Sequence, residues 1–308
     1  MPAAEIPIHS NLKVKISSPW GFPLREDLAF TDSHGADGHR YGKFVKRALK
    51  LLQEPLRKIL LPEEVVLYLG RGQLMPEGPE RYMLGAPYRI LARTGLILTN
   101  RRLLCVSMGW EGRWHRNLRY ACWGDVEAFN ITGRIRGRLL LKYRNGNSET
   151  YWHIPKLAAE KLQIILDAVL AAPGEEVSVA LGMANFCPQC LAQLTPEIYI
   201  CPNCRVKFKN ERGVLLHALL IPGGGYFYAG LNLLGIAHAF IDVGILASVI
   251  VWILAAMGRV RPPPMPGVPP VKWVFVFSAT ILSAFLALDI WLAIRVAQRA
   301  VRNFTPII

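Results

Sequence analysis

Two long apolar runs in the last third of the chain most constrain how it can fold. The first covers residues 231–257, and the second begins after Lys272 and continues to residue 294. As a helix rising about 1.5 Å per residue, either run is long enough to cross a hydrocarbon core of about 30 Å. The proline-rich segment 259–270 between them cannot be helical and must be a short loop. We therefore expect a transmembrane helical hairpin with spans 231–257 and 273–294.

A third apolar piece, residues 214–221, is too short to span a membrane alone and leads into the glycine- and aromatic-rich segment 222–230. Glycines allow close backbone approach, and aromatic rings prefer the membrane interface. We expect an interfacial or re-entrant segment over residues 213–230, with a third span as the alternative. The basic residues that precede it place this side in the cytoplasm, whereas the charges on the two sides of the second run balance and leave the C-terminal side open.

Four of the six cysteines stand in two Cys-x-x-Cys pairs, Cys187 with Cys190 and Cys201 with Cys204. Each pair can direct two thiolates at one ion, and two pairs complete the tetrahedral four-sulfur shell that structural zinc prefers. A thioredoxin-type motif needs one pair, and disulfides are rare in cytosolic domains. We expect one structural Zn²⁺ held by all four cysteines, with no open position for catalysis.

Two short segments carry resemblances to known families. Residues 186–205 resemble a zinc ribbon, in which the insert between the cysteine pairs forms a strand returning to the second pair. The Gly-rich turn followed by Tyr-Phe-Tyr-x-Gly in residues 222–230 resembles the opening of small two-span membrane domains that follow zinc ribbons in bacterial proteins. The resemblance implies a ribbon joined directly to a membrane hairpin.

The region before the cysteines has the pattern of a small β domain. Short runs rich in β-branched and aromatic residues alternate with turn formers, and Asn145-Gly146 is a hairpin signal. Apolar residues at helical spacing then predict a closing helix over residues 155–171. The expected strands are 65–69, 88–93, 95–99, 103–108, 123–131, 138–143 and 149–153.

This order resembles the pleckstrin-homology (PH) superfold. The run GLILTNRRLL at residues 95–104 resembles the strand-turn-strand signature of bacterial PH-like and GRAM-type domains, and WGDVEAF at residues 123–129 resembles their following strand. The resemblance implies a membrane-surface or protein-binding module. The expected fold class is therefore a multidomain α+β membrane protein with a PH-like antiparallel β domain and C-terminal helix, a zinc ribbon and a transmembrane hairpin. Its expected domains are 1–60, an irregular arm with an amphipathic helix; 61–172, the PH-like domain; 173–212, linker and ribbon; and 213–308, the membrane domain.

The helix of the first segment has apolar residues from Phe44 to Leu56 at helical spacing, with lysines and an arginine outside them. It is expected to pack on the β domain, with a membrane-surface helix as the alternative, and Pro55 is expected to kink or end it.

The chain is basic, with 36 Lys and Arg against 22 Asp and Glu, for a net charge of +14. Such a charge suits an anionic partner, either phospholipid headgroups or nucleic acid. Arginines near the β-domain turns could meet phosphate groups, or could form an ordinary solvated face paired with nearby acids. The candidates are Arg101, Arg102, Arg113, Arg116, Arg134 and Arg136.

Three ionisable residues fall inside the expected spans. His238 and Asp242 are four residues apart on one helical face, and Asp289 lies in the second span. Ionisable groups in hydrocarbon are costly and therefore indicate function, such as an ion or proton path. Interhelical hydrogen bonding or an oligomer contact is the interpretation we favour over transport.

These features predict a membrane-anchored binding or scaffold protein that docks a protein complex or a lipid surface. The chain contains none of the phosphate-loop, nucleophile-elbow or His-Glu-x-x-His motifs, so we expect no enzyme activity. Residues 1–8 lack a signal peptide, and we place the soluble domains on the cytoplasmic side of a bacterial inner membrane. Expected partners are membrane lipids and a protein complex or a second copy of the chain. Alternatives are a membrane-tethered nucleic-acid binder and an ion or proton transport accessory.

Overall fold

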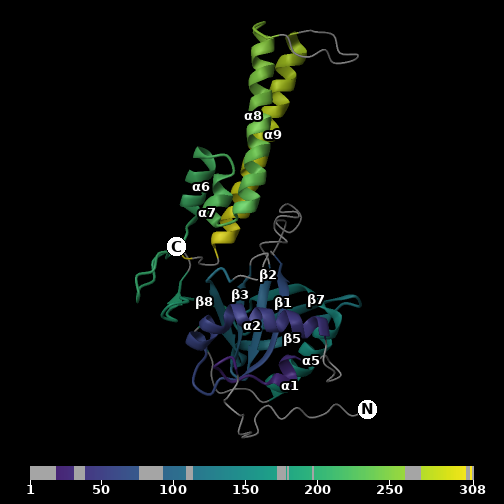
Figure 1. Ribbon diagram of the computed structural model, residues 1–308, viewed down its shortest axis with the longest axis vertical. Coiled ribbons are helices and arrows are strands. Elements are labelled where there is room, and N and C mark those ends of the chain that lie inside the picture. Colours follow the sequence, from purple (N-terminus) through teal and green to yellow (C-terminus); the bar gives the residue numbers. More distant parts are fainter. Residues whose placement is uncertain are drawn as a thin grey trace. The chain divides into compact units, whose positions relative to one another are not determined.

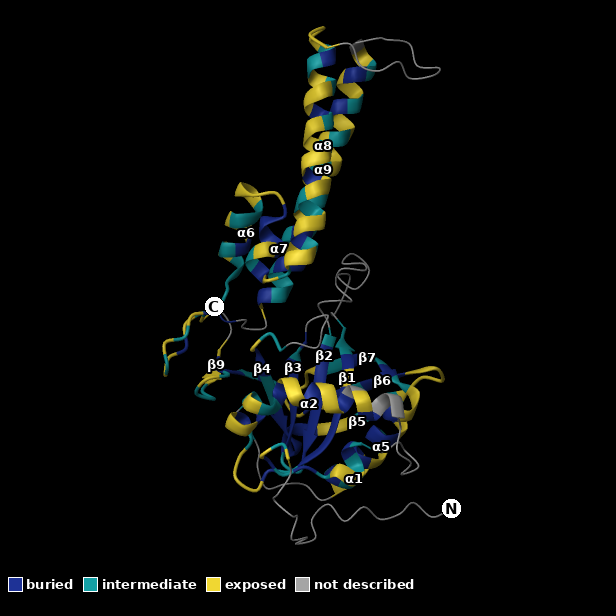
Figure 2. Ribbon diagram, in the orientation of Figure 1, coloured by how far each residue is buried: buried dark blue, intermediate teal, exposed yellow. Residues whose placement is uncertain are grey.

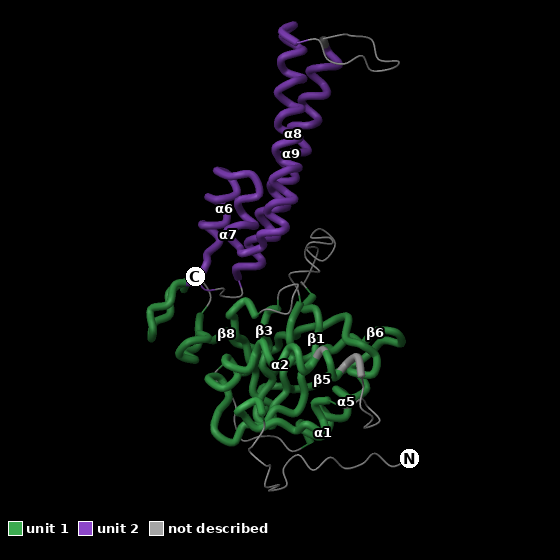
Figure 3. Tube along the Cα trace, in the orientation of Figure 1, with its two compact units in different colours: residues 1–81, 88–207, 308 green, residues 82–87, 208–307 purple. Residues whose placement is uncertain are grey.

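The computed structural model divides the chain into two compact units, shown in Figure 3. The first, here called the sheet unit, runs up to Lys207 apart from residues 82–87, and the second, the helical unit, begins at Phe208. The four cysteines therefore belong to the same unit as the sheet. The structure describes residues 19–30, 39–75, 93–108, 114–171, 178, 180–195, 198–260, 272–302 and 306.

Antiparallel strands of the sheet unit form one nine-stranded sheet in the order β5-β6-β7-β1-β2-β3-β4-β8-β9 among the described residues. The β6–β7 hairpin turns at Asn145-Gly146, as predicted, with Gly146 at a φ of 83° that favours glycine. The strands are β1 (Val66–Leu74), β2 (Arg93–Thr99), β3 (Arg102–Ser107), β4 (Leu118–Cys122), β5 (Val126–Thr132), β6 (Arg136–Tyr143), β7 (Ser148–Pro155), β8 (Ala184–Phe186) and β9 (Gln193–Leu194).

Helices cover this sheet on two faces (Figure 1). Helix α5 (Lys156–Ala171) buries its apolar side in one cluster, which also holds Trp123 and Tyr151. Helix α2 (His39–Ile59) buries its apolar side in a second cluster against strands β1, β2 and β3, together with the short helix α1 (Glu26–Ala29). The two clusters make the sheet the middle layer of the unit.

The packing of α2 decides between the two interpretations of the basic amphipathic helix. Val45, Leu49, Leu52 and Leu56 are all buried in the second cluster, while Lys43 and Lys46 are exposed. Because this apolar face is covered by the sheet, it is not free to lie on a membrane. Pro55 does not end the helix, which continues to Ile59. The side chain of Phe44 lies outside the described residues.

The strand boundaries differ from the sequence expectation at several places, among them β1, which continues to Leu74 beyond the expected end at residue 69. Strand β4 was not anticipated, and residues Trp123–Asp125, expected to open a strand, form a 3-10 turn before β5. Trp123 is buried there, and its indole N–H donates to the Thr99 carbonyl at 2.9 Å. Strand β8, just before Cys187, and strand β9, between the two cysteine pairs, extend the sheet into the cysteine-containing segment. Most of the expected strand 88–93 lies outside the described residues.

In the described part of the helical unit, two short helices precede two long ones. Helices α6 (Glu211–Leu220) and α7 (Gly224–Ala229) precede α8 (Asn232–Ala256) and α9 (Lys272–Val301). Among the described residues, α8 and α9 are long and apolar enough to cross a membrane. Figure 2 shows that most of their surface is exposed, and the large apolar side chains on it include Phe240 and Phe277. The apolar piece expected at 214–221 lies mostly within α6, which is too short to span a membrane.

Candidate metal centre

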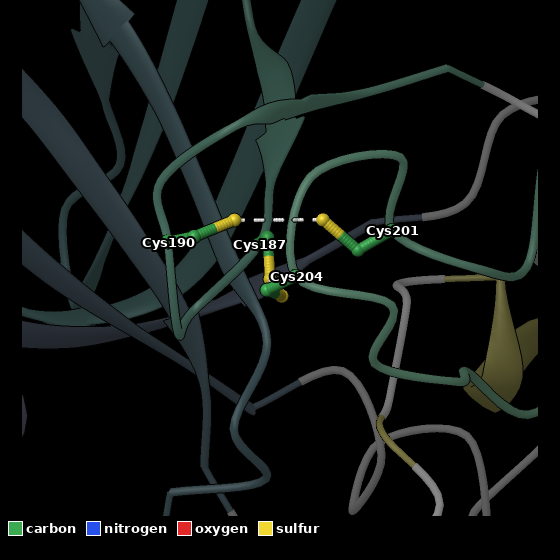
Figure 4. A group of neighbouring side chains, drawn as sticks. All are labelled: Cys187, Cys190, Cys201 and Cys204. Carbon is green, nitrogen blue, oxygen red and sulfur yellow. Dashed lines mark hydrogen bonds between the residues drawn. The ribbon is translucent and has the colours of Figure 1, made fainter.

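The end of β8 and a following loop bring the four cysteines together, and Figure 4 shows their side chains directed toward one another. Strand β8 pairs with β4, with Phe186 opposite Leu118, and its last residue immediately precedes Cys187. The ring of Phe186 stacks on Tyr120 of β4 with centroids 3.6 Å apart. The first cysteine pair is thus attached to the edge of the main sheet.

The two cysteine pairs lie in turns with the same hydrogen-bond pattern. In the first turn, Cys187 N–H donates to the Ala192 carbonyl at 2.9 Å, and Leu191 N–H donates to the Cys187 carbonyl at 2.9 Å. In the second, Cys201 N–H donates to Val206 at 2.8 Å, and Arg205 N–H donates to Cys201 at 3.1 Å. Since donors and acceptors are offset identically, the two turns present their sulfurs in equivalent ways.

Each turn is closed by a residue with a left-handed backbone. Leu191 and Arg205, which directly follow the second cysteine of their pairs, have φ values of 58° and 62°. Side chains other than glycine adopt this region at a cost of about 1 kcal/mol. The same backbone conformation thus recurs at the same position of both turns.

The sulfur positions fit one tetrahedral ion. Cys187 Sγ lies 3.5 Å from Cys204 Sγ, Cys190 Sγ lies 3.5 Å from Cys201 Sγ, and all four sulfurs lie within 4.8 Å of one another. Four sulfurs at about 2.3 Å from a central ion would be about 3.8 Å apart. A disulfide requires about 2.05 Å, and all four thiols are free. The arrangement is therefore compatible with a metal site and not with two disulfides.

Electrostatics also favour a cation at the centre. Burial raises the pKa of the Cys187 thiol to about 12, whereas hydrogen bonds from the Ala192 amide and the neighbouring thiols lower the pKa of Cys190 to about 7 although burial opposes this. Further backbone amides, including that of Val206, donate to the sulfurs. Thiolates this close repel one another unless a positive ion neutralises them, so a dication would stabilise all four as ligands.

The arginines proposed as anionic contacts are dispersed over the sheet unit. Arg134 and Arg136 are exposed at the β5–β6 turn, and Arg116 is exposed before β4. Arg101 lies half-buried in the β2–β3 turn. Arg113 lies outside the described residues. Among the described candidates, Arg134 and Arg136 therefore lie together and exposed on the β5–β6 turn.

Arg102 does not face the solvent, contrary to the sequence expectation. Arg102 is only 4% exposed, and its Nη2 donates to Glu64 Oε2 at 2.9 Å. Its guanidinium carbon lies over the Tyr120 ring, 4.4 Å from the ring centroid. Glu64 lies far from Arg102 in the sequence, so local pattern could not reveal the pair. Arg102 is an interior ion-pair residue.

Two neighbours of the arginine turn are not among the six candidate arginine contacts. Ile135 stands between Arg134 and Arg136 at the tip of the turn and is 85% exposed, and Arg138 lies 5.4 Å from the Trp152 ring centroid. A single isoleucine between arginines, just after a glycine, was the available signal. The pairing of Arg138 with Trp152 depends on the β6–β7 register and has no local signal.

The three ionisable residues of the apolar helices also meet. His238 and Asp242 of α8 and Asp289 of α9 each offer one ligand atom, and these atoms lie within 4.8 Å of one another. The sequence placed two of them on one helix face but could not place the third. This cluster lies in the helical unit and is separate from the cysteines.

No protein-family model, curated protein or solved structure matches this chain. Its class is therefore defined by its own structure. The chain is a mixed α+β protein with an antiparallel sheet, a four-cysteine cluster compatible with a metal site, and two helices long and apolar enough to cross a membrane.

Proposed function

We propose that this chain is a membrane-anchored binding or scaffold protein whose sheet unit and cysteine centre lie on the cytoplasmic side of a bacterial inner membrane. The observation that carries the proposal is the exposure of α8 and α9. In the most apolar 18-residue stretch of each helix, only 17% of α8 and 11% of α9 is buried within the protein. A core helix of a soluble domain would be mostly covered, so these surfaces need lipid around them.

In this proposal the sheet unit is a PH-like domain. Seven strands followed by a C-terminal helix, β1 to β7 and then α5, support this interpretation. The four-cysteine cluster is its attached zinc ribbon. Four thiolates are the ligand set that zinc takes in structural sites, and they leave no position for a substrate.

The buried cysteine of the sheet unit is unsuited to act as a nucleophile. Cys105 is fully enclosed in the sheet unit, and burial raises the pKa of its thiol to about 12. Because the thiolate is the reactive form, this cysteine is inert at neutral pH. Its sulfur lies 3.3 Å from the Tyr151 hydroxyl, as part of a packed polar group inside the sheet.

The β5–β6 turn is the surface we assign to docking, and an anionic phospholipid surface is the partner it fits. Exposed Arg134 and Arg136 flank the exposed Ile135. Cations beside an apolar side chain suit a headgroup layer, where phosphates meet the guanidinium groups and the apolar group enters the interface. Trp152, whose ring centroid lies 5.4 Å from the Arg138 guanidinium carbon, adds an aromatic ring of the kind enriched at interfaces.

Extraction of native membranes with alkaline carbonate tests the anchor. The full chain should remain in the membrane pellet and be released only by detergent, because α8 and α9 span the bilayer. Release by carbonate alone would show a peripheral protein and remove the proposal.

Docking is tested with full chains reconstituted in vesicles of phosphatidylcholine alone or with phosphatidylglycerol. An environment-sensitive dye on Ile135→Cys should shift to shorter wavelength only with phosphatidylglycerol, and Arg134→Glu with Arg136→Glu should abolish the shift. The same dye on Leu157→Cys, an exposed position on α5, is the control. Equal emission in both vesicles would exclude lipid docking, and a subunit that co-purifies in mild detergent would identify a protein partner instead.

A further inference from the structure

Two carboxylates and an imidazole converge between the long helices of the helical unit. His238 and Asp242 are one turn apart on α8, and Asp289 faces them from α9. His238 Nε2 lies 3.3 Å from Asp289 Oδ2. The three side chains thus form a compact set of nitrogen and oxygen ligands on helices of otherwise apolar composition.

The converging atoms are the ones that hydrogen bonds leave unsatisfied. Asp242 is 7% exposed, and its Oδ2 accepts a hydrogen bond from the Gly223 amide at 3.2 Å. Its Oδ1, together with His238 Nε2 and Asp289 Oδ2, is buried and accepts or donates no well-formed hydrogen bond among the described residues; the 3.3 Å approach of His238 Nε2 to Asp289 Oδ2 is an ion pair only when the imidazole is protonated. Buried polar atoms without partners are rare, and an unoccupied ligand position is one reason for them.

The start of α7 holds this set in place. Gly223 has a φ of 68°, and a Cβ there would lie 2.2 Å from the Gly235 carbonyl oxygen of α8. A Cβ on Gly235 would in turn lie 2.7 Å from the Phe227 ring. This close approach places the Gly223 amide on Asp242, while the Tyr226 ring meets the His238 imidazole edge-on at 5.1 Å. The ligands are oriented before any ion binds.

We propose that His238, Asp242 and Asp289 bind one divalent transition-metal ion, such as Zn²⁺ or Mn²⁺, at a centre separate from the four cysteines. Ligands about 2.1 Å from a tetrahedral ion lie about 3.4 Å apart, close to the His238–Asp289 separation. Imidazole and carboxylate together suit borderline and hard divalent metals and not Cu(I). Two carboxylates on apolar helices need neutralising charge, which a dication supplies.

The number of ligands indicates an accessible ion. Structural sites usually have four protein ligands, whereas three protein ligands leave a position for water or another group. The two proposed centres therefore differ in kind: the cysteine cluster is closed, and this centre keeps a free coordination position. A site of this kind between apolar helices could bind and release metal.

Cobalt binding to the full chain in mild detergent tests the proposal. Protein stripped with a chelator is equilibrated with Co²⁺, and metal per chain is measured together with the visible spectrum. The variant with all four metal-centre cysteines replaced by serine should still bind one Co²⁺, with d–d bands but no sulfur-to-cobalt charge transfer. The variant His238→Gln with Asp242→Asn and Asp289→Asn should lose one Co²⁺ and keep the charge-transfer bands.

Isosteric replacements keep the test independent of folding. Asp242→Asn retains a side-chain oxygen for the Gly223 amide, so its circular dichroism and elution volume should match the parent while its Co²⁺ affinity falls by at least about tenfold. Asp167→Asn, which removes a carboxylate on α5, should change neither. If the triple variant binds as much Co²⁺ as the parent, or if the four-serine variant binds none, the cluster is a protonated interhelical contact and the proposal is overturned.

Discussion

Glu64 and Arg102 form a buried ion pair that connects the end of α2 to the β2–β3 turn. The guanidinium donates to both carboxylate oxygens, at 3.0 and 2.9 Å, and to the Ile59 carbonyl at 2.8 Å. Thr99 Oγ1 donates to the same carboxylate at 2.8 Å. Because both charges are desolvated, each depends on the other for compensation.

Removing one partner of this pair should destabilise the sheet unit strongly. We expect Glu64→Leu, which leaves a buried guanidinium uncompensated, to lower the free energy of unfolding by about 3–5 kcal/mol. Urea titration of the detergent-solubilised chain, followed by tryptophan fluorescence, measures this. The control is Glu127→Gln, which removes the exposed pair with Lys142 and should cost less than about 1 kcal/mol. Equal losses in the two variants would contradict the assignment.

The strained residue after each cysteine pair offers a second prediction. Arg205 is exposed and has a φ of 62°, so Arg205→Gly removes a conformational cost without removing a buried contact. A gain of about 1 kcal/mol corresponds to about fivefold tighter metal binding. Competition with a chromogenic chelator measures the affinity.

A nearby exposed position supplies the control. Lys207 pairs with Ile200 in an isolated bridge and has no positive φ. Lys207→Gly should therefore weaken the fold by about 0.5–1 kcal/mol, because glycine only adds freedom to the unfolded chain there. Tighter metal binding in both variants would show that the gain does not come from the backbone of Arg205.

Two glycines of α8 should respond differently to substitution by alanine. Gly235→Ala places a methyl group 2.7 Å from the Phe227 ring and should separate α7 from α8, with a lower midpoint of thermal unfolding in detergent. Gly244→Ala meets nothing within 4 Å and should leave the midpoint unchanged or raise it, because alanine favours helix. Equal midpoints would show that α7 does not pack on α8.

Local pattern predicted what depends on neighbours in the chain. The Cys-x-x-Cys spacing sufficed to predict that the sulfurs of Cys187 and Cys190 converge, because one turn positions both. The length of the apolar runs sufficed to predict the long helices α8 and α9. The burial of Arg102 depends on its ion pair with Glu64, and the position of the first cysteine pair depends on the pairing of Phe186 with Leu118. Neither relationship leaves a periodic signal, since each is set by tertiary packing between distant segments.

The pairing of Phe186 with Leu118 also predicts how far the effect of metal loss extends into the sheet. Hydrogen exchange of the full chain, followed by mass spectrometry, should show that a chelator removes protection from the two cysteine turns, residues 187–192 and 201–206, and reduces it in the adjacent strands β8 and β9. Strands β1 to β7 should keep their protection, because the cluster around Trp123 and α5 does not include the cysteine turns. Restoring Zn²⁺ should restore the lost protection. Loss of protection in β1 to β7 as well would show that the cysteine centre and the sheet fold as one cooperative unit.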